Sequence, residues 1–229
     1  MKVAPARDAA FHILLKVALT DAHSDELLRT RQVDVLMQPD RALATTLVLG
    51  ALRWQLKLDA RIRPLLSRPD AKLSPAVETA LRLGAYQLLY LDRIPAYAAI
   101  SDSVELAKQA GEAHAARMVN AVLRKVARLP SGSHDLKPES AQEIANSYAH
   151  PGWIVERWIR TYGLNTTEAI CRFDQQPAPA SIRLLDPGAE SDLKEEAIQL
   201  EPGEFLPAAR RVVSGDVVRC RVFREGRIR

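Results

Sequence analysis

The chain has 229 residues, of which 47% are apolar and 26% charged, as in ordinary globular proteins, and this length suits two domains. No apolar run approaches the roughly 20 residues that a membrane-spanning helix needs, and two distant cysteines form no disulfide framework. We therefore expect a cytoplasmic protein with no membrane partner. The short apolar run near the start contains Asp8, His12 and Lys16, which favours an amphipathic helix over a signal peptide.

The net charge of +4 is unevenly distributed along the chain. Residues 1–130 carry a net charge of +6, residues 131–209 carry −7, and residues 210–229 carry +5. A basic first part favours a polyanionic partner, because cations that neutralise phosphates release counterions. Scattered arginines that only keep the surface soluble would give the same balance, so charge alone leaves both interpretations open.

The first 130 residues have the apolar periodicity of helices throughout, and no strand pattern. Between Leu43 and Ile62 apolar residues recur at steps of three or four and predict a single apolar stripe. Arg53, Lys57 and Arg61 are expected on the opposite side of this stripe.

The next two predicted helices have clear boundaries. Ser74 and Pro75 combine an N-cap hydroxyl with a proline at the first helical position, and Pro95 ends the helix that they open. A second helix contains Ile100 and Val104 and is expected to close at Gly111.

The last predicted helix of this part has two different faces. Ala115, Val119, Val122 and Val126 share an apolar face, and the opposite face presents Arg117, Asn120, Arg124 and Arg128. Guanidinium groups can bind phosphates in a bidentate manner, and a carboxamide can pair with base edges. Lys2 and Arg7 could join this surface if the first helix packs alongside. Spacing alone favours a solvated helix face over an RNA contact.

Residues 129–133 contain proline, glycine and serine and predict the domain boundary, giving domains 1–130 and 131–229. Residues 138–173 are expected to be helical again. After them frequent turns separate a short piece at 180–185, a helix at 191–200 and a strand at 217–223, where Val218, Cys220 and Val222 alternate with arginines. Residues 224–227 resemble an unfinished hairpin, so we expect the second domain to be truncated.

Several catalytic chemistries are excluded by spacing. The glycines are nowhere closer than eleven residues, so no loop can cradle a nucleotide or S-adenosylmethionine. No Cys/His pairs have zinc-ligand spacing, and Cys171 and Cys220 fit buried core positions. The adjacent triad residue types at 133–135 cannot converge as a triad does. We therefore expect no catalytic residue, metal or cofactor in this chain.

Four segments carry a resemblance to a known family: 47–53 (LVLGALR), 81–89 (LRLGAYQLL), 92–95 (DRIP) and 119–124 (VNAVLR). They closely resemble the NusB-like domain of the bacterial 16S rRNA cytosine-C5 methyltransferases of the Sun/RsmB type. The segments 151–158 (PGWIVERW) and 178–183 (APASIR) resemble the stretch that joins this domain to the catalytic domain in the same enzymes.

This resemblance implies a mainly α fold, with an all-helical NusB-like bundle followed by a small helical and α+β subdomain. It also implies that ribosomal RNA is the partner. In NusB-like domains the start of the first helix and the Val-Asn helix lie near RNA, which carries over to Arg7 and Asn120. Met118 stands where NusB proteins often have an aromatic residue.

The resemblance further implies that the full-length parent binds S-adenosylmethionine through a catalytic domain that would be the partner in cis. The family's glycine-rich loop and its Pro-Cys and Thr-Cys motifs are missing from these residues. The expected function is thus the RNA-recognition portion of an rRNA (cytosine-C5) methyltransferase. The alternative is a stand-alone NusB-like RNA-binding antitermination factor.

Overall fold

The computed structural model describes residues 3–129, 138–176 and 178–229. Contacts between elements divide the chain into an N-terminal unit, Met1–Gln175, and a C-terminal unit, Gln176–Arg229. The break expected at 129–133 and the residues 133–135 fall largely outside the described residues. The expected division into 1–130 and 131–229 therefore stays a prediction, although the helical residues 141–174 group with the helices that precede them.

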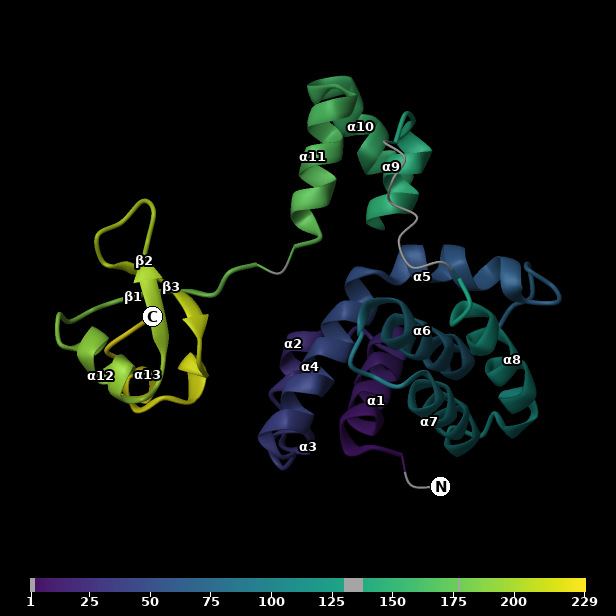
Figure 1. Cartoon of the computed structure of the whole chain (residues 1–229), viewed down its shortest axis with the longest axis horizontal. Coiled ribbons are helices and arrows are strands. Elements are labelled where there is room, and N and C mark those ends of the chain that lie inside the picture. Colours follow the sequence, from purple (N-terminus) through teal and green to yellow (C-terminus); the bar gives the residue numbers. More distant parts are fainter. Residues whose placement is uncertain (1–2, 130–137, 177) are drawn as a thin grey trace. The chain divides into compact units, whose positions relative to one another are not determined.

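The first part of the N-terminal unit is a bundle of helices around one apolar core (Figure 1). Helix α6 is central, because it contacts α1, α4, α5, α7 and α8. The largest fully buried side chains of this core include Phe11, Leu47, Leu81, Leu106 and Leu123. The helices are α1 Pro5–Leu19, α2 Ser24–Leu28, α3 Arg31–Asp34, α4 Gln38–Arg53, α5 Gln55–Ile62, α6 Pro75–Tyr90, α7 Ala96–Gln109 and α8 Ala116–Val126, with 3-10 turns at Arg63–Leu65 and Ala113–Ala115.

The start of α6 confirms the sequence prediction, but its end does not: the helix stops at Tyr90, before the residues around Pro95 that were expected to end it, and Pro95 instead precedes α7. The Ser74 hydroxyl accepts a hydrogen bond from the backbone N–H of Val77, and Pro75 occupies the first turn. An N-cap of this kind satisfies one of the backbone donors that the first turn leaves unpaired. The mainly helical fold expected from the periodicity is likewise confirmed.

The single stripe expected between Leu43 and Ile62 is interrupted. The helix breaks at Trp54, which separates α4 from α5 and stacks on Tyr90 with ring centroids 4.9 Å apart. The expectation that Lys57 lies on the solvent side is wrong, because it is only 8% exposed and its Nζ donates to the Ser147 carbonyl over 3.0 Å. This hydrogen bond joins α5 to the last turn of the helix α9, Ala141–Tyr148.

Three further helices complete the N-terminal unit: α9 Ala141–Tyr148, α10 Gly152–Tyr162 and α11 Leu164–Asp174. They enclose a small separate core of Ile144, Ala145, Val155 and Cys171. Ser140 caps α9 by accepting from Glu143 N–H, and Ala149 takes a left-handed conformation (φ 53°) that ends the helix. The expected helical segment at 138–173 is therefore present as three short helices.

The C-terminal unit contains an antiparallel sheet in the order β1-β3-β2, packed with two short helices over a second small core. Its elements are β1 Ser181–Arg183, α12 Ala189–Glu195, β2 Gln199–Pro202, β3 Ala209–Ser214, a 3-10 turn Val217–Arg219 and α13 Arg221–Arg224. In the register, Ile182 pairs with Arg210 on one side of β3 and Leu200 with Val212 on the other.

Three expectations for this unit are corrected by the structure. The strand expected at 217–223 is a 3-10 turn and a short helix, because the Glu196 carboxylate accepts from Arg221 N–H at 2.9 Å and the Cys220 sulfur accepts from Phe223 N–H, which caps α13. The helix expected at 191–200 ends at Glu195, and residues 199–202 form β2 instead. The residues after α13 form no hairpin of their own, since Ile228 bridges back to Leu184.

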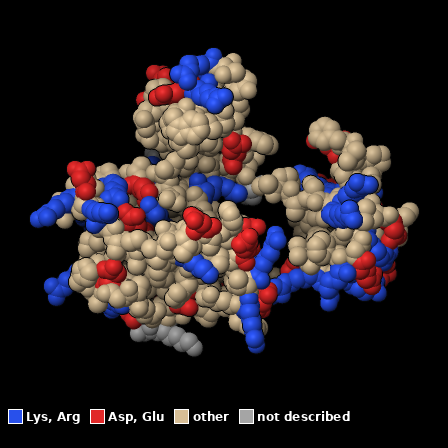
Figure 2. All heavy atoms as spheres, turned by 180° about the vertical axis from the view of Figure 1, so that it is seen from behind, with Lys and Arg blue, Asp and Glu red and all other residues tan. Residues whose placement is uncertain are grey.

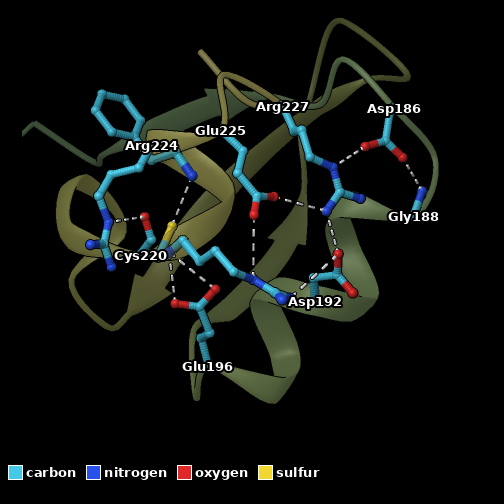
Figure 3. A network of polar contacts seen from close by, with 10 residues as sticks. Asp186, Gly188, Asp192, Glu196, Cys220, Arg224, Glu225 and Arg227 are labelled. Carbon is cyan, nitrogen blue, oxygen red and sulfur yellow. Dashed lines mark hydrogen bonds and ion pairs between the residues drawn. The ribbon is translucent and has the colours of Figure 1, made fainter.

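A charged network holds the last residues of this unit in place (Figure 3). The Arg227 guanidinium donates to Asp186 and to Asp192, and it also lies 3.5 Å from a Glu225 oxygen. Hydrogen bonding from Arg227 is the main cause that holds the pKa of Asp186 below its usual value. The side chains thus connect the loop after β1, helix α12 and the end of the chain.

Candidate RNA-binding surface

Helix α8 separates apolar and basic side chains as the sequence predicts. Its buried residues, Val119, Val122, Leu123 and Val126, face the core, where α8 contacts α5, α6 and α7. The other side carries the predicted site residues, of which Arg117 and Arg124 are exposed, Asn120 is half-buried, and Arg128 lies exposed in the turn after the helix.

A groove of about 710 Å³ lies between α7 and α8. Helix α8 contributes Asn120 and Arg124, so the structure brings two of the predicted residues into one recess. The α7 side combines half-buried apolar residues with polar ones. Its lining residues are Tyr97, Ile100, Ser101, Val104, Glu105 and Lys108.

Tyr97 is the aromatic residue of this groove, and the sequence did not identify it. Its side chain is 77% exposed at the start of α7, although a large aromatic ring is usually at least half-buried. The sequence held one usable signal, a tyrosine two positions after Pro95, but only the packing of α7 against α8 places it beside Asn120. Met118, in contrast, packs against the core and offers no ring to a ligand.

The cations around the groove differ in their availability. Lys108 is paired with Glu105 at 3.2 Å, and Lys125 donates to the Leu65 carbonyl at 3.0 Å. Arg117, Arg124 and Arg128 form no ion pair with the other described residues. Three exposed guanidinium groups therefore remain able to bind an anion such as a phosphate.

Arg7 has a different environment from the one that the resemblance implies. It is 9% exposed, its Nε donates to Gln87 Oε1, and its Nη1 lies 3.0 Å from an Asp102 oxygen. The Asp102 carboxylate also accepts from Ala4 N–H. Arg7 thus joins α1 to α6 and α7 from inside the bundle. Lys2, the other predicted residue of the chain start, lies outside the described residues.

Lys57 has the most perturbed environment among the lysines described. Burial, and next the charge of Arg61, lowers its pKa to about 8. Its ammonium lies 5.2 Å from the centre of the Trp54 ring as well as against the Ser147 carbonyl. This arrangement joins α5 to α9 and supports packing between the two helices.

Two helical glycines have no room beside them for a cofactor such as S-adenosylmethionine. Neighbouring side chains already fill the space beside them, since a Cβ at Gly50 would meet the Tyr86 ring and one at Gly84 would meet Leu123. Burial raises the pKa of the Cys171 thiol to about 11, which is opposite to what a nucleophile needs. Within the described ranges, no three Asp, Glu, His or Cys side chains are grouped as metal ligands, and no helix could span a membrane.

Two protein families match this chain. Residues 4–128 match the NusB family, and residues 150–185 match the ferredoxin-like domain described as Methyltr_RsmF/B-like. The probable ribosomal RNA small subunit methyltransferase B of Bacillus subtilis (strain 168) is 32% identical over 234 residues. That alignment covers 100% of this chain but 52% of the relative, so the chain spans about half the length of that protein.

Two solved structures share the fold of all or part of this chain. The crystal structure of PH0851 covers 100% of this chain and 53% of that chain with a TM-score of 0.71, and at 17% identity it supports the fold alone. NusB in the crystal structure of antitermination factors NusB and NusE in complex with dsRNA is 27% identical, with a TM-score of 0.50. It covers 55% of this chain and 96% of that chain.

Proposed function

Because this chain belongs to the NusB family and matches the N-terminal half of proteins named ribosomal RNA small subunit methyltransferase B, we propose that it is the RNA-recognition portion of an rRNA (cytosine-C5) methyltransferase. The observation that carries this proposal is the surface around the α7–α8 groove. It combines an exposed tyrosine, a carboxamide and three guanidinium groups without ion-pair partners among the described residues.

Each group of this surface has a distinct use in RNA binding. Arg117, Arg124 and Arg128 would bind phosphates, which sets the affinity and its dependence on salt. Asn120 would pair with a base edge, and the Tyr97 ring would stack on an unpaired base, because RNA is read mainly where its bases are unstacked. A related NusB was solved in complex with dsRNA, which supports RNA as the ligand class.

The stand-alone antitermination factor is the less supported alternative. The NusB chain matches 55% of this chain, whereas the methyltransferase B relative matches all of it. The additional match at 150–185, to a ferredoxin-like domain of RsmF/B-type methyltransferases, favours the enzyme further. In the whole protein, a catalytic domain in cis would bind S-adenosylmethionine, whose methyl group would go to C5 of a cytosine in the rRNA. We propose that the protein acts in the cytoplasm and that ribosomal RNA is the molecule it binds.

Charge reversal of Arg124 tests the proposal. Arg124→Glu should weaken binding of 16S rRNA fragments by about 10-fold or more, because it removes one phosphate contact and adds repulsion. The melting temperature should stay nearly unchanged, since Arg124 is exposed. Binding can be measured by fluorescence anisotropy at several salt concentrations, where about three phosphate contacts predict a log–log slope near −2 to −3.

Arg29→Glu is a matched control, because Arg29 is also exposed but follows α2, which packs against α1 and α4. It should change affinity by less than about threefold through general charge alone. Equal losses in both variants, or an affinity that does not depend on salt, would contradict a localised phosphate-binding surface.

A further inference from the structure

Helix α10 has an outward face that combines a tryptophan, two arginines and one glutamate, Glu156, which is also exposed. Val155 is buried, and Ile154, Trp158 and Ile159 pack against the same small core. The helical spacing therefore places Trp153, Arg157 and Arg160, at steps of four and three, together on the side away from this core.

Trp153 is 66% exposed. This is unusual, because a tryptophan side chain has a large apolar surface whose burial stabilises a protein. The other two tryptophans of the chain, Trp54 and Trp158, are half-buried and make ring contacts with Tyr90 and His150. No aromatic partner of Trp153 occurs among the described residues. An exposed tryptophan without such a contact is typical of a binding surface.

The two arginines of this face are available in the same way. Arg157 and Arg160 are exposed and pair with no acidic side chain of the described part. Figure 2 shows positively charged side chains at the outer end of the α9–α11 group, with acidic ones beside them. Between residues 138 and 176 only Arg157, Arg160 and Arg172 are positively charged, so α10 supplies two of the three.

We propose that Trp153, Arg157 and Arg160 form a second RNA-contact surface, which takes an unpaired nucleotide on the indole ring and its neighbouring phosphates on the two guanidinium groups. Long side chains of a helix lean toward its N-terminus, so Arg157 extends over the turn that carries Trp153. Phosphates next to a stacked base lie within reach of such a side chain. This inference rests on the proposed function, because it assumes that rRNA is the ligand.

RNA fits this face better than an acidic protein segment does. Arginine alone would serve either ligand, but the open indole ring adds a flat surface of the kind on which bases stack. Stacking on an aromatic side chain needs no particular base, so this surface would add affinity for unpaired nucleotides and little sequence preference.

The test compares single-stranded and structured 16S rRNA fragments bound by four forms of the protein: wild type, Trp153→Ala, Trp153→Phe and Arg157→Gln/Arg160→Gln. Trp153→Ala should weaken binding by about 5- to 100-fold with an unchanged salt slope, since it removes a stacked base. Trp153→Phe should retain affinity to within about threefold, because a phenyl ring still stacks. The double glutamine variant should reduce the salt slope by about 1.4, for two phosphates of a single strand.

Two matched controls substitute exposed residues of the same types that lie outside α10. Phe173→Ala removes another exposed aromatic ring, and Arg29→Gln/Arg31→Gln removes another exposed arginine pair. Neither should change affinity by more than about twofold, or the salt slope by more than a few tenths, since neither residue set combines a ring with guanidinium groups. Melting temperatures should be equal in all variants, because every altered side chain is exposed.

Failure of this inference can be separated from failure of the proposed function. If the α10 variants bind like wild type while Arg124→Glu binds weakly, the second surface is refuted and the first stands. If the wild-type protein binds no rRNA, both are refuted. If Trp153 is already shielded from acrylamide in the free protein, or if an acidic peptide protects it and rRNA does not, the face is occupied by protein and the RNA inference is overturned.

Discussion

Arg7 and Arg124 show how one residue type can have opposite roles in the same chain. The sequence pattern made both of them candidates, and the family resemblance turned both into expected RNA contacts. In the structure Arg7 is enclosed by Gln87 and Asp102, whereas Arg124 is exposed beside the α7–α8 groove. A guanidinium whose donors are already used inside the protein contributes to stability, so the two substitutions should have different effects.

Arg7→Gln should lower the free energy of unfolding by about 3 kcal/mol, because it leaves the buried Asp102 carboxylate without its cationic partner. Urea denaturation followed by circular dichroism measures this loss. The Arg7→Gln/Asp102→Asn variant should recover part of it, since no buried charge then remains. A fully stable Arg7→Gln protein with weakened RNA binding would show that Arg7 acts at the RNA after all.

Lys57 should make stability depend on pH in the alkaline range. Its pKa of about 8 in the folded protein is below the value of 10.5 expected when it is exposed, so between these values the unfolded chain holds a proton that the folded chain has lost. Stability contributed by Lys57 should therefore rise as pH increases from about 8 to 10. Urea midpoints of wild type relative to Lys57→Met should increase over this range; parallel pH profiles would contradict the burial of Lys57.

At the scale of the elements, close packing of α6 orients α8 and its basic face. A Cβ at Gly84 would lie 2.6 Å from a Leu123 methyl and 2.7 Å from the Ser103 hydroxyl, both buried. Gly84→Ala should therefore destabilise the protein by about 1–3 kcal/mol, although alanine normally favours a helix. Thermal unfolding measures the loss. Gly152→Ala, where the nearest atom is 3.9 Å away, is the control and should be neutral or slightly stabilising.

The elements that the sequence predicted well depend on local signals. Ser74 with Pro75 marks the start of α6, and the two-faced spacing of α8 is visible within eleven residues. Helix α13 was missed because Val218, Cys220 and Val222 alternate as they would in a strand. The group that favours the helix there is the Glu196 carboxylate, which is 25 positions before Arg221 and cannot be recognised locally.

As with the helices, the residues of the candidate site were predictable only where the signal lies within one helix. Asn120 and Arg124 followed from the spacing within one helix, and the structure places both in the groove. Tyr97 and the exposure of Trp153 could not be predicted, because each depends on how a helix packs against others. Apolar periodicity identifies the residues that face a core, but it does not distinguish an exposed aromatic ring from a buried one.

At the scale of the whole molecule, the two units have separate cores, so we expect them to unfold separately at low pH. Hydrogen bonds from Arg227 and Arg210 hold the pKa values of Asp186 and Glu190 below their usual range. Carboxylates of this kind stabilise the fold above their unfolded pKa near 4, and the contribution is lost as pH falls through the lowered folded values. The C-terminal unit should therefore lose structure in acid.

Hydrogen–deuterium exchange can follow this loss by peptide, from neutral pH to about pH 3. Peptides from 178–229 should lose protection, and Asp186→Asn should already reduce their protection at neutral pH because it weakens the contact with Arg227. Tryptophan fluorescence reports separately on the N-terminal unit, which contains all three tryptophans. Full protection of 178–229 at pH 3 would contradict a stabilising role for these ion pairs.

The central claim is that the α7–α8 surface of this chain contacts ribosomal RNA. Ultraviolet crosslinking to 16S rRNA fragments, with the crosslinked peptides mapped by mass spectrometry, tests it most directly. We predict crosslinks at Tyr97 and in the peptide that contains Asn120, with loss of the crosslinks in Arg124→Glu. Crosslinks confined to residues 178–229, or none that Arg124→Glu reduces, would contradict the claim.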